Sequence, residues 1–376
     1  MAERLRVLQV VECGGPGGTG YQVAALCNGL DPGTFEVQLA YSVRPGTSPA
    51  EYEAMARGAS RFHHVPEMVR EISPLSDLRA FWKLYRLFRQ TRPDLVHAHS
   101  SKAGFLARVA GWLARAPRIY YSPHGYAFLQ TDSPPLKRTL YRWLEWSVSW
   151  IGKIIAVSYS EAALARGLTS RVHVVRDAYL GESPDERERG ANPDVVFCTL
   201  GRMSYARNPE AFVRLARGLA LARAKVRCVW IGAGELEPEV RRLAQSLRLE
   251  PVLELTGWLP HARALEALRR ADVLVQFSRW EGLPNSVLEA MACGLPVLAS
   301  DIPGNRELVR PDETGLLAPT EEDLLRQALI LAGDPALRRR MGANGRDIVK
   351  RDFTRERLLR EITAVYKQTA MSGSGK

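Results

Sequence analysis

Two glutamates, Glu281 and Glu289, stand on either side of a turn rich in glycine and proline, and their spacing predicts a ligand-binding site. The apolar run 271–276 before them is short and β-branched, which predicts a buried parallel strand. Pro284 fits the first turn of a helix, where its missing N–H costs nothing, and Gly294 is typical of a helix end. We therefore expect Glu281 at the carboxyl end of the strand and Glu289 on the second turn of the helix.

The start of that helix is expected to bind an anion, because the backbone N–H groups within residues 283–286, of which Pro284 has none, lack a partner within the helix. The candidates for this contact are Gly282, Leu283, Pro284 and Asn285. A carboxylate on each side of such a site predicts a ligand with many hydroxyls and a phosphate, as in a nucleotide sugar. The alternative is that Glu281 caps the helix and Glu289 is merely solvated.

The segment 279–297 resembles the E-x7-E signature of family 4 of the retaining glycosyltransferases. Glu289 follows Glu281 by eight positions, Gly-Leu-Pro-Asn stands between them, and Cys-Gly-Leu-Pro-Val ends the helix. The resemblance implies the GT-B fold, an α/β architecture in which two Rossmann-like parallel domains face a central cleft. It also implies that Glu281 holds hydroxyls of the donor sugar and that Glu289 holds the ribose hydroxyls of the nucleotide.

A second candidate segment, 201–210, contains Arg202 and Arg207 directly after a predicted strand. The guanidinium fork suits phosphate oxygens, so two arginines on one strand-to-helix loop can clamp a departing diphosphate. The segment matches the family's Gly-Arg…Lys-Asn/Gly pattern, with Arg207 at the usual lysine. The alternative is a surface pair near a helix start, where positive charge is mildly unfavourable.

Further donor-pocket candidates follow the next two strands of the second half. Gly232 and Gly234 resemble the family's Gly-x-Gly-Pro turn, with Glu235 in place of proline. A lone Gly-x-Gly is also common in tight turns that bind nothing. Trp258 lies after the third strand, where related enzymes hold the nucleobase partly through backbone groups.

The first loop, 13–20, is rich in glycine and lets backbone approach a ligand closely; its candidates are Gly15, Gly17 and Gly18. It is not the dinucleotide fingerprint, because Pro16 interrupts the glycine order and no acidic residue ends the second strand. In the family, Gly-Gly at this place faces the donor phosphates and the acceptor. The Glu-Arg pair that usually follows in the family is missing here, so the residues that contact the acceptor are not predicted.

Three histidines of the first half follow or end predicted strands. His97 and His99 share one strand face, which could suggest a metal, but no third ligand is identifiable and no D-x-D motif occurs. The family places a histidine at the position of His124 beside the donor sugar, so His124 is a catalytic candidate. The alternative for His124 is a hydrogen-bonded loop residue. For His99 and Lys102 the functional and structural interpretations stay open.

Strands and helices alternate along the chain, which predicts parallel α/β sheets. We expect an N-terminal acceptor-side domain over 1–180, a linker over 181–194 and a nucleotide-sugar domain over 195–351. The resemblance implies that a last helix, 352–370, crosses back to the first domain, and 371–376 is expected to be disordered. Predicted strands are 5–11, 35–41, 95–99, 118–121, 153–157, 172–175, 195–200, 226–231, 252–255, 273–275 and 297–299. Predicted helices include 18–30, 75–90, 103–114, 337–351 and 354–367.

Composition favours a cytoplasmic enzyme of two domains, since a chain of 376 residues is longer than the chains that usually fold around a single hydrophobic core. Five dispersed cysteines are expected to be small buried residues in a reducing compartment. No signal peptide or membrane-spanning run is recognisable. The net charge of +11 fits the binding of phosphorylated substrates or of an anionic membrane surface. No nucleic-acid-binding motif is recognisable, so nucleic acid is not an expected partner.

The segment 136–150 combines basic residues with three tryptophans, so it could lie at the inner face of the cytoplasmic membrane. Burial of most of these rings against the domain core is the interpretation that we favour.

The resemblance implies a hexosyltransferase that retains the anomeric configuration and needs no metal or other cofactor. The donor is expected to be a UDP-sugar and the acceptor a glycan or a lipid-linked sugar, in polysaccharide or glycoconjugate biosynthesis. Arg202, Arg207 and the helix start near Pro284 would stabilise the charge on the leaving phosphate. The alternative is a GT-B protein that binds the nucleotide sugar without catalysis or epimerises it.

Overall fold

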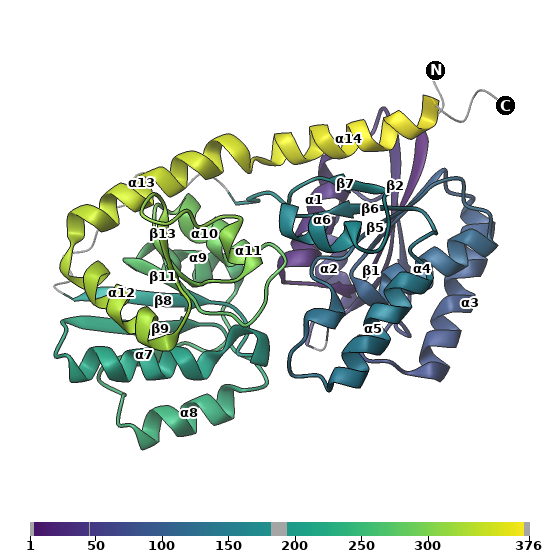
Figure 1. The fold of residues 1–376 in the computed structure, drawn as a ribbon. Helices are drawn as coiled ribbons and strands as arrows, with labels where there is room; N and C mark the ends of the chain where they lie inside the picture. Colours follow the sequence, from purple (N-terminus) through teal and green to yellow (C-terminus); the bar gives the residue numbers. More distant parts are fainter. Residues whose placement is uncertain (1–3, 45, 182–193, 372–376) are drawn as a thin grey trace. The chain divides into compact units, whose positions relative to one another are not determined.

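The computed structural model describes residues 4–44, 46–181 and 194–371. The chain divides into two compact units, one formed by Met1–Leu180 with Arg355–Lys376 and the other by Gly181–Thr354. Figure 1 shows the elements of each unit with their labels. The predicted linker and the predicted disordered tail lie largely outside the described residues.

In the described part of the first unit, a seven-stranded parallel sheet has the order β3-β2-β1-β4-β5-β6-β7. Its strands are β1 (Leu5–Gly14), β2 (Phe35–Val43), β3 (Arg61–His64), β4 (Leu95–His99), β5 (Ile119–Ser122), β6 (Lys153–Ala156) and β7 (Val172–Val174). Strand β4 is buried along its whole length and β1 along most of it, and the polar side chains Gln9, His97 and His99 are buried with them.

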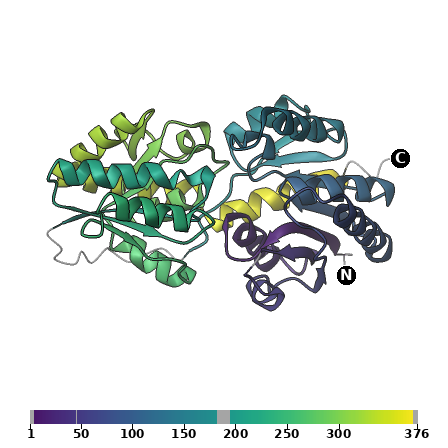
Figure 2. The same ribbon diagram turned by 90° about the horizontal axis from the view of Figure 1, so that it is seen from below.

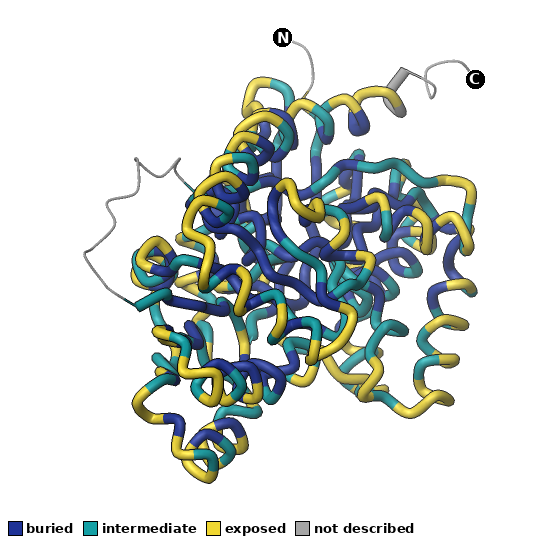
Figure 3. The backbone as a smooth tube through the Cα atoms, turned by 60° about the vertical axis from the view of Figure 1, so that its left-hand side comes forward, coloured by how far each residue is buried: buried dark blue, intermediate teal, exposed yellow. Residues whose placement is uncertain are grey.

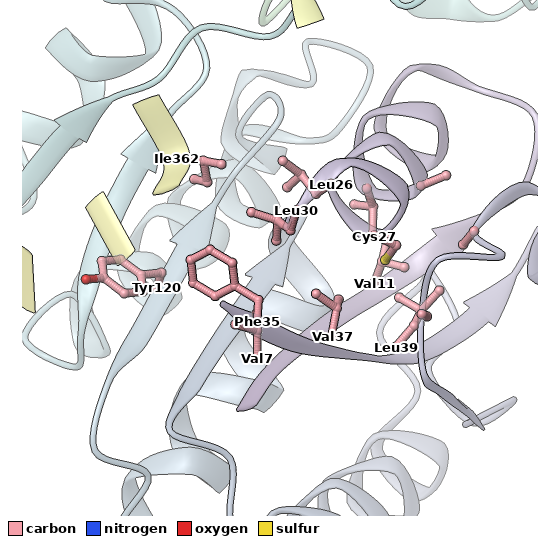
Figure 4. Close-up of a cluster of buried hydrophobic side chains, with 14 of the residues drawn as sticks. Val7, Val11, Leu26, Cys27, Leu30, Phe35, Val37, Leu39, Tyr120 and Ile362 are labelled. Atoms are coloured by element: carbon pink, nitrogen blue, oxygen red, sulfur yellow. The ribbon is translucent and has the colours of Figure 1, made fainter. Parts of the chain in front are cut away.

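The helices of the first unit cover both faces of its sheet (Figure 2). They are α1 (Gly18–Gly29), α2 (Pro49–Met55), α3 (Pro74–Thr91), α4 (Ser101–Leu113), η1 (Ala127–Leu129), α5 (Pro135–Ser147), α6 (Tyr159–Arg166) and α14 (Arg355–Met371). One core cluster lies under α1 and α14, and Figure 4 shows side chains from it, including Val7, Leu26 and Ile362. A second cluster lies under α3 and α4.

The second unit contains, among its described residues, a six-stranded parallel sheet of order β10-β9-β8-β11-β12-β13. Its strands are β8 (Val195–Leu200), β9 (Val226–Ile231), β10 (Leu253–Leu255), β11 (Val273–Gln276), β12 (Val297–Ser300) and β13 (Gly315–Ala318). Its helices are η2 (Tyr205–Arg207), α7 (Pro209–Leu221), α8 (Glu237–Ser246), α9 (His261–Arg269), α10 (Asn285–Ala292), α11 (Pro303–Arg306), α12 (Glu321–Gly333) and α13 (Pro335–Asp352). The prediction of two parallel α/β sheets is confirmed.

The helix α14 belongs to the first unit although it follows the second unit in sequence. Four of its side chains, Leu358, Ile362, Val365 and Tyr366, are buried in the cluster under α1. Figure 3 shows how the buried positions, in dark blue, gather along the strands and the inner faces of helices. The core of the first unit is therefore built from two distant parts of the chain.

The prediction that the tryptophans of 136–150 pack against the core is wrong. Trp143, Trp146 and Trp150 are 56%, 59% and 51% exposed. The residue of α5 that is buried is Glu145, because its carboxylate pairs with Arg108 at 2.6 Å and turns that face of the helix inward. The apolar face of α5 is left in solvent.

Two further observations concern the predicted cellular setting. Among the described residues, no helix combines the length and the hydropathy required to cross a membrane. The five cysteines are buried, as predicted.

Candidate active site

The loops of the second unit that carry the predicted site residues start next to each other. Strands β8 and β11 are neighbours at the centre of the sheet, and the chain continues outward from them in opposite directions. Ligands of open parallel sheets bind beyond the carboxyl ends of strands at such a switch point. The loops 201–208 and 277–284 both begin there.

Glu281 is held by donors that all reach one oxygen. Its Oε1 accepts hydrogen bonds from Gln276 Nε2 and Ser278 Oγ, each at 2.8 Å, and lies 3.3 Å from Arg207 Nη1. Within the described part of the chain, Oε2 has no such partner. A Cβ at Gly304 would lie 2.7 Å from Glu281 Cβ, so glycine lets α11 pack closely here. The carboxylate is fixed on one side and available on the other.

Arg207 is joined to the start of α10 as well as to Glu281. Its Nη1 donates to Ser286 Oγ at 3.0 Å, and Ser286 Oγ donates to Gln276 Oε1 at 3.0 Å. The side chain of Arg207 is 22% exposed. A largely buried guanidinium therefore lies beside the first turn of α10, where backbone N–H groups already favour an anion.

The two predicted arginines contact different carboxylates. Arg202 Nε donates to Glu235 Oε2 at 2.7 Å, and both side chains are 51% exposed. Exposed ion pairs of this kind contribute little and open readily. Arg207 is thus positioned by the protein, whereas Arg202 is a surface side chain in this structure.

Glu289 lies on the second turn of α10, as predicted from the spacing, and has a partner that sequence reasoning missed. His261 Nε2, at the start of α9, lies 2.9 Å from Glu289 Oε1. Trp258, in the preceding loop, is 65% exposed. These three side chains come from loops and helices after β10 and β11.

Gly232 and Gly234 have a packing role. Gly232 has a φ of +134°, and a Cβ on it would lie 2.3 Å from the carbonyl oxygen of Gly201. At Gly234 a Cβ would lie 2.3 Å from the carbonyl oxygen of Met203. Close contact between the loops after β8 and β9 therefore requires glycine at both positions.

The anion-binding candidates at the start of α10 surround its first turn. The helix begins at Asn285, one residue later than Pro284, whose carbonyl accepts the N–H of Val287 at 3.0 Å. Leu283 and Pro284 are buried, and Gly282 is half-buried. Of these two buried residues, only Leu283 has a backbone N–H that can contact an anion, because proline has none.

In the first unit, the glycine-rich loop connects β1 to α1. Gly15 has a φ of +124°, and a Cβ on Gly20 would lie 2.1 Å from the Gly15 carbonyl oxygen. The loop therefore folds tightly over the first turn of α1, in which Gly18 is the first residue. A Cβ on Gly17 would lie 3.1 Å from Arg44 Nη1.

The histidines of the first unit form a buried cluster. The rings of His97 and His99 lie 4.1 Å apart on one face of β4, which confirms their predicted common face. His124 Nε2 lies 3.0 Å from His99 Nδ1, and His124 Nδ1 lies 3.4 Å from Asp177 Oδ2. His124 has a φ of +50°, which is costly for a residue with a side chain. Both ring nitrogens of His124 thus face protein groups.

The titration of these histidines differs with their surroundings. Burial lowers the pKa of His97 to about 3 and holds the pKa of His99 well below its ordinary value. Burial also opposes the charged form of His124, but the attraction of Asp177, followed by Glu161 and Glu12, outweighs it and raises the pKa of His124. Burial raises the pKa of Glu12 and of Glu161.

Lys102 Nζ pairs with Asp77 Oδ1 at 2.5 Å, and both side chains are largely buried. No group of three or more potential metal-ligating side chains is found within the described ranges. The supporting residues Gln276, Ser278 and Ser286 were missed, although a glutamine at the end of an apolar strand was a visible signal.

Comparisons with known proteins agree with this architecture. Residues 17–179 match the family described as Glycosyl transferase 4-like domain, and residues 183–348 match Glycosyl transferases group 1. The chain is 29% identical over 325 residues to the UDP-Gal:alpha-D-GlcNAc-diphosphoundecaprenol alpha-1,3-galactosyltransferase of Escherichia coli, covering 81% of this chain and 83% of that protein. It is 30% identical over 304 residues to the GDP-mannose-dependent alpha-mannosyltransferase of Mycobacterium tuberculosis, covering 74% and 75%.

Among solved structures, sucrose-phosphate synthase of Thermosynechococcus elongatus superposes with a TM-score of 0.79 at 20% identity, covering 98% of this chain and 100% of that one. This likeness concerns the fold. The two family matches and the relatives at 29% and 30% identity carry the assignment further. The chain belongs to the group 1, or family 4, glycosyltransferases of GT-B fold.

Proposed function

We propose that this glycosyltransferase moves a hexose from a UDP-sugar to a glycan or lipid-linked acceptor, with retention of configuration and without a metal. The observation that carries the proposal is the Arg207–Glu281 pair, held at the start of α10 by Gln276, Ser278 and Ser286. It combines a fixed cation for phosphate with a carboxylate for sugar hydroxyls.

In the proposed reaction the bond between the anomeric carbon and the diphosphate breaks while the acceptor oxygen bonds to the same face of that carbon. The leaving phosphate takes the acceptor's proton. Arg207 and the N–H groups at the start of α10 stabilise the charge that builds on the phosphate, and Arg202 joins them after leaving Glu235. Such fixed donors replace the charge stabilisation that a metal would supply.

Glu281 Oε2 is proposed to accept hydrogen bonds from the sugar, and Glu289, oriented by His261, from the ribose. Gly232, Gly234 and Trp258 are proposed to border the nucleotide. Gly15, Gly17, Gly18 and His124 are proposed to act on the donor and acceptor from the first unit. The choice of UDP is supported by the UDP-Gal donor in the name of the Escherichia coli relative, while the name of the mycobacterial relative gives GDP-mannose as the donor.

A donor screen tests this proposal. Thermal unfolding is followed with UDP, GDP, ADP and their common sugars, in the presence of EDTA. One nucleotide at 100 times its Kd should stabilise the protein by about 2.7 kcal/mol, and this gain should vanish in Glu289→Ala and Arg207→Ala. Arg270→Ala is the matched control, because Arg270 forms an exposed pair with Glu266 at 2.6 Å near the end of α9. No response to any nucleotide would contradict the proposal.

Product analysis separates transfer from the alternative of a binding or epimerising protein. With the identified donor and candidate acceptors, we expect a glycoside that keeps the anomeric configuration, and EDTA should not slow its formation. Nucleotide binding without transfer or hydrolysis would favour a binding protein. Conversion of the donor to its epimer without an acceptor would favour an epimerase.

We also propose that α5 brings the enzyme to an anionic membrane surface. Leu136, Leu140 and Trp143 follow one another at helical spacing and are 82%, 45% and 56% exposed. The basic residues of α5 are Lys137, Arg138 and Arg142, and its single acidic residue is the buried Glu145. Exposed apolar rings beside basic residues match the boundary between headgroups and acyl chains.

A groove beside α5 has the chemistry for a lipid phosphate. Its walls include Phe128, Leu129, Leu164 and Leu168, and two guanidinium groups, Arg138 and Arg142, line it. Arginine pairs well with phosphate oxygens, and the apolar walls suit an acyl or prenyl chain. A lipid-linked acceptor is supported by the diphosphoundecaprenol acceptor in the name of the Escherichia coli relative.

Vesicle co-sedimentation tests the membrane contact. Wild type should bind vesicles of phosphatidylglycerol more strongly than vesicles of phosphatidylcholine, and Trp143→Ser with Trp146→Ser should release it. The matched control is Leu221→Ser with Ile330→Ser, since these side chains are 73% and 50% exposed in the second unit. Equal loss in both double variants, or no binding by wild type, would contradict the proposal.

A further inference from the structure

A continuous chain of buried hydrogen bonds links α14 to His124. At one end, Ser122 Oγ donates to the Ile155 carbonyl oxygen at 2.7 Å. His97 Nε2 lies 2.9 Å from Ser122 Oγ, and His97 Nδ1 lies 2.6 Å from the hydroxyl of Tyr366, which comes from α14. The chain then passes from Tyr366 to Gln9, whose Nε2 lies 3.2 Å from the hydroxyl.

The other half of the chain ends at a carboxylate. Gln9 Oε1 lies 2.8 Å from His99 Nε2, and His99 Nδ1 lies 3.0 Å from His124 Nε2. His124 Nδ1 faces Asp177 Oδ2 at 3.4 Å. Gln9, His97 and His99 are almost fully buried, so water does not replace these partners.

Both ends of this chain can only accept. The Ile155 carbonyl has no proton, and the ionised carboxylate of Asp177 has none either. Ser122 has one hydroxyl proton and gives it to Ile155, so His97 must donate to Ser122 with Nε2–H. A chain that ends on an acceptor at both sides must contain one member that donates in both directions.

Only a histidine can be that member. Ser122 and Tyr366 have a single proton each, and Gln9 donates through nitrogen while it accepts through oxygen. A neutral histidine donates with one ring nitrogen and accepts with the other, whereas an imidazolium donates with both. The chain therefore holds one excess proton, and one of His97, His99 and His124 is a cation.

We propose that the excess proton resides on His124, with Asp177 and Tyr366 as the positioning residues that keep it there. His124 is the histidine that contacts a carboxylate, since its ring faces Asp177. Glu161 on α6 and Glu12 on β1 add attraction, while His97 and His99 on β4 add none when neutral. The orientation of the Gln9 amide leads to the same assignment. Its oxygen faces His99 Nε2, so that nitrogen carries a proton, and a neutral His99 must then accept from His124 through Nδ1.

The assignment changes what His124 can do. With both nitrogens donating, His124 has no lone pair and cannot act as a base. It contributes a fixed positive charge and the strained turn that continues into Gly125, whose N–H donates to Glu161 Oε1 at 2.7 Å. The catalytic part of this inference rests on the proposed function, but the position of the proton does not.

Histidine side-chain ¹⁵N NMR tests the position of the proton without reference to activity. At neutral pH we expect His97 and His99 to be neutral with Nε2–H, and His124 to be protonated at both nitrogens. Resonances are assigned by the loss of each signal in the corresponding glutamine variant. A proton on His97 or His99 instead, or three neutral histidines beside a protonated Asp177, would overturn the proposal.

Two variants test the positioning residues. Asp177→Asn removes the charge and should lower the pH at which His124 titrates by roughly 1–3 units. Tyr366→Phe removes the hydroxyl that joins His97 to Gln9, so the Gln9 amide is free to turn its nitrogen toward His99. His99 can then accept from Gln9 and donate to His124. Because His124 no longer has to donate with both nitrogens, it should also titrate at lower pH. Tyr120→Phe is the matched control, because its hydroxyl bonds the Val365 carbonyl of the same helix outside the chain.

The pH profile of kcat connects this state to catalysis. In wild type, activity should fall as pH rises through the pKa of His124, and this limb should move to lower pH in Asp177→Asn and Tyr366→Phe but not in Tyr120→Phe. If NMR shows the predicted shifts while the profiles stay unchanged, the catalytic part fails and the proton assignment stands. Identical NMR titrations in all variants would refute the role of both positioning residues.

Discussion

Glu281 illustrates how one side chain is prepared for a ligand, because its three donors reach the same oxygen. We expect Glu281→Gln to lower kcat by about 10²–10³-fold, since in the proposed reaction a fixed charge beside the sugar is lost. Binding of the free nucleotide should change little, because the proposed contact is with the sugar. Steady-state kinetics and thermal shifts with the nucleotide measure the two effects.

Glu254→Gln is the control for that substitution, because Glu254 forms an exposed pair with Arg227 at 3.0 Å. It should leave both measurements unchanged. Full turnover in Glu281→Gln would show that its carboxylate does not act on the donor.

His97 gives the first unit a pH dependence of stability. Its pKa is about 3 in the folded protein, below the value of about 6.5 in an unfolded chain. The contribution of neutral His97 to the free energy of unfolding is therefore complete above pH 6.5. It is lost as pH falls toward 3, because the unfolded state takes up the proton first. The loss amounts to about 1.4 kcal/mol per pH unit.

Urea unfolding of wild type and His97→Gln between pH 6 and pH 4 measures this contribution. The free energy of unfolding of wild type should fall more steeply with acid, by about that slope. If the free energy of unfolding depended on pH equally in the two proteins, His97 would have to keep its ordinary pKa in the folded protein, and the prediction would be wrong. The difference between the two proteins removes the contribution of the carboxylates common to both.

At the scale of elements, Arg108 and Glu145 decide how α5 is oriented. Arg108 Nη2 pairs with Glu145 at 2.6 Å, its guanidinium lies 4.2 Å from the ring centroid of Tyr121, and the Tyr121 hydroxyl donates to Glu145 at 2.8 Å. Removing one partner leaves a buried charge, so Glu145→Ala should destabilise the first unit by about 3–5 kcal/mol. Chemical unfolding followed by tryptophan fluorescence is the measurement.

Replacing both partners at once, Arg108→Met with Glu145→Leu, should recover most of that stability, because no charge is then buried alone. A double variant as unstable as the single one would mean that the pair is needed for its attraction.

The same helix shows where sequence reasoning failed. Most tryptophan rings of 136–150 were predicted to be buried, but Glu145, whose carboxylate has a buried partner 37 positions away, lies on the inward face instead. The strands were predictable because most are continuous apolar runs between turns. The edge strand β3, with the sequence Arg-Phe-His-His, offers no such run and was missed, as was β13.

The candidate site was predictable to a similar extent. Glu281, Glu289 and Arg207 could be named as candidates because motif spacing within one loop or helix is visible in sequence. Their partners Gln276, Ser286 and His261 were not, because these contacts depend on how neighbouring loops meet. Asp177 and Tyr366 join His124 and His97 across distances in sequence that no local pattern records.

At the scale of the whole molecule, the first unit depends on α14. Leu358, Ile362, Val365 and Tyr366 are buried in its core, and Arg357 donates to the carbonyl oxygens of Arg176 and Asp177. We expect truncation after Thr354 to unfold the first unit, since burial of each large apolar side chain stabilises by about 1.5–3 kcal/mol. The second unit should keep its fold.

Hydrogen exchange resolved by peptide distinguishes these results. Protection should be lost in β1, β2 and β4 of the truncated protein and retained in β8, β9 and β11. Retained protection throughout would contradict the dependence, and loss throughout would mean that the second unit cannot fold without the first.

The placement of α14 also has a consequence for biosynthesis. The first 180 residues leave the ribosome before the second unit, yet the helix that completes their core is made after it. At roughly 5–20 residues per second, translation of the intervening segment takes on the order of 10–35 s. During that interval the nascent first unit exposes the apolar side chains that α14 will cover, and a chaperone that binds such surfaces has a defined window in which to act.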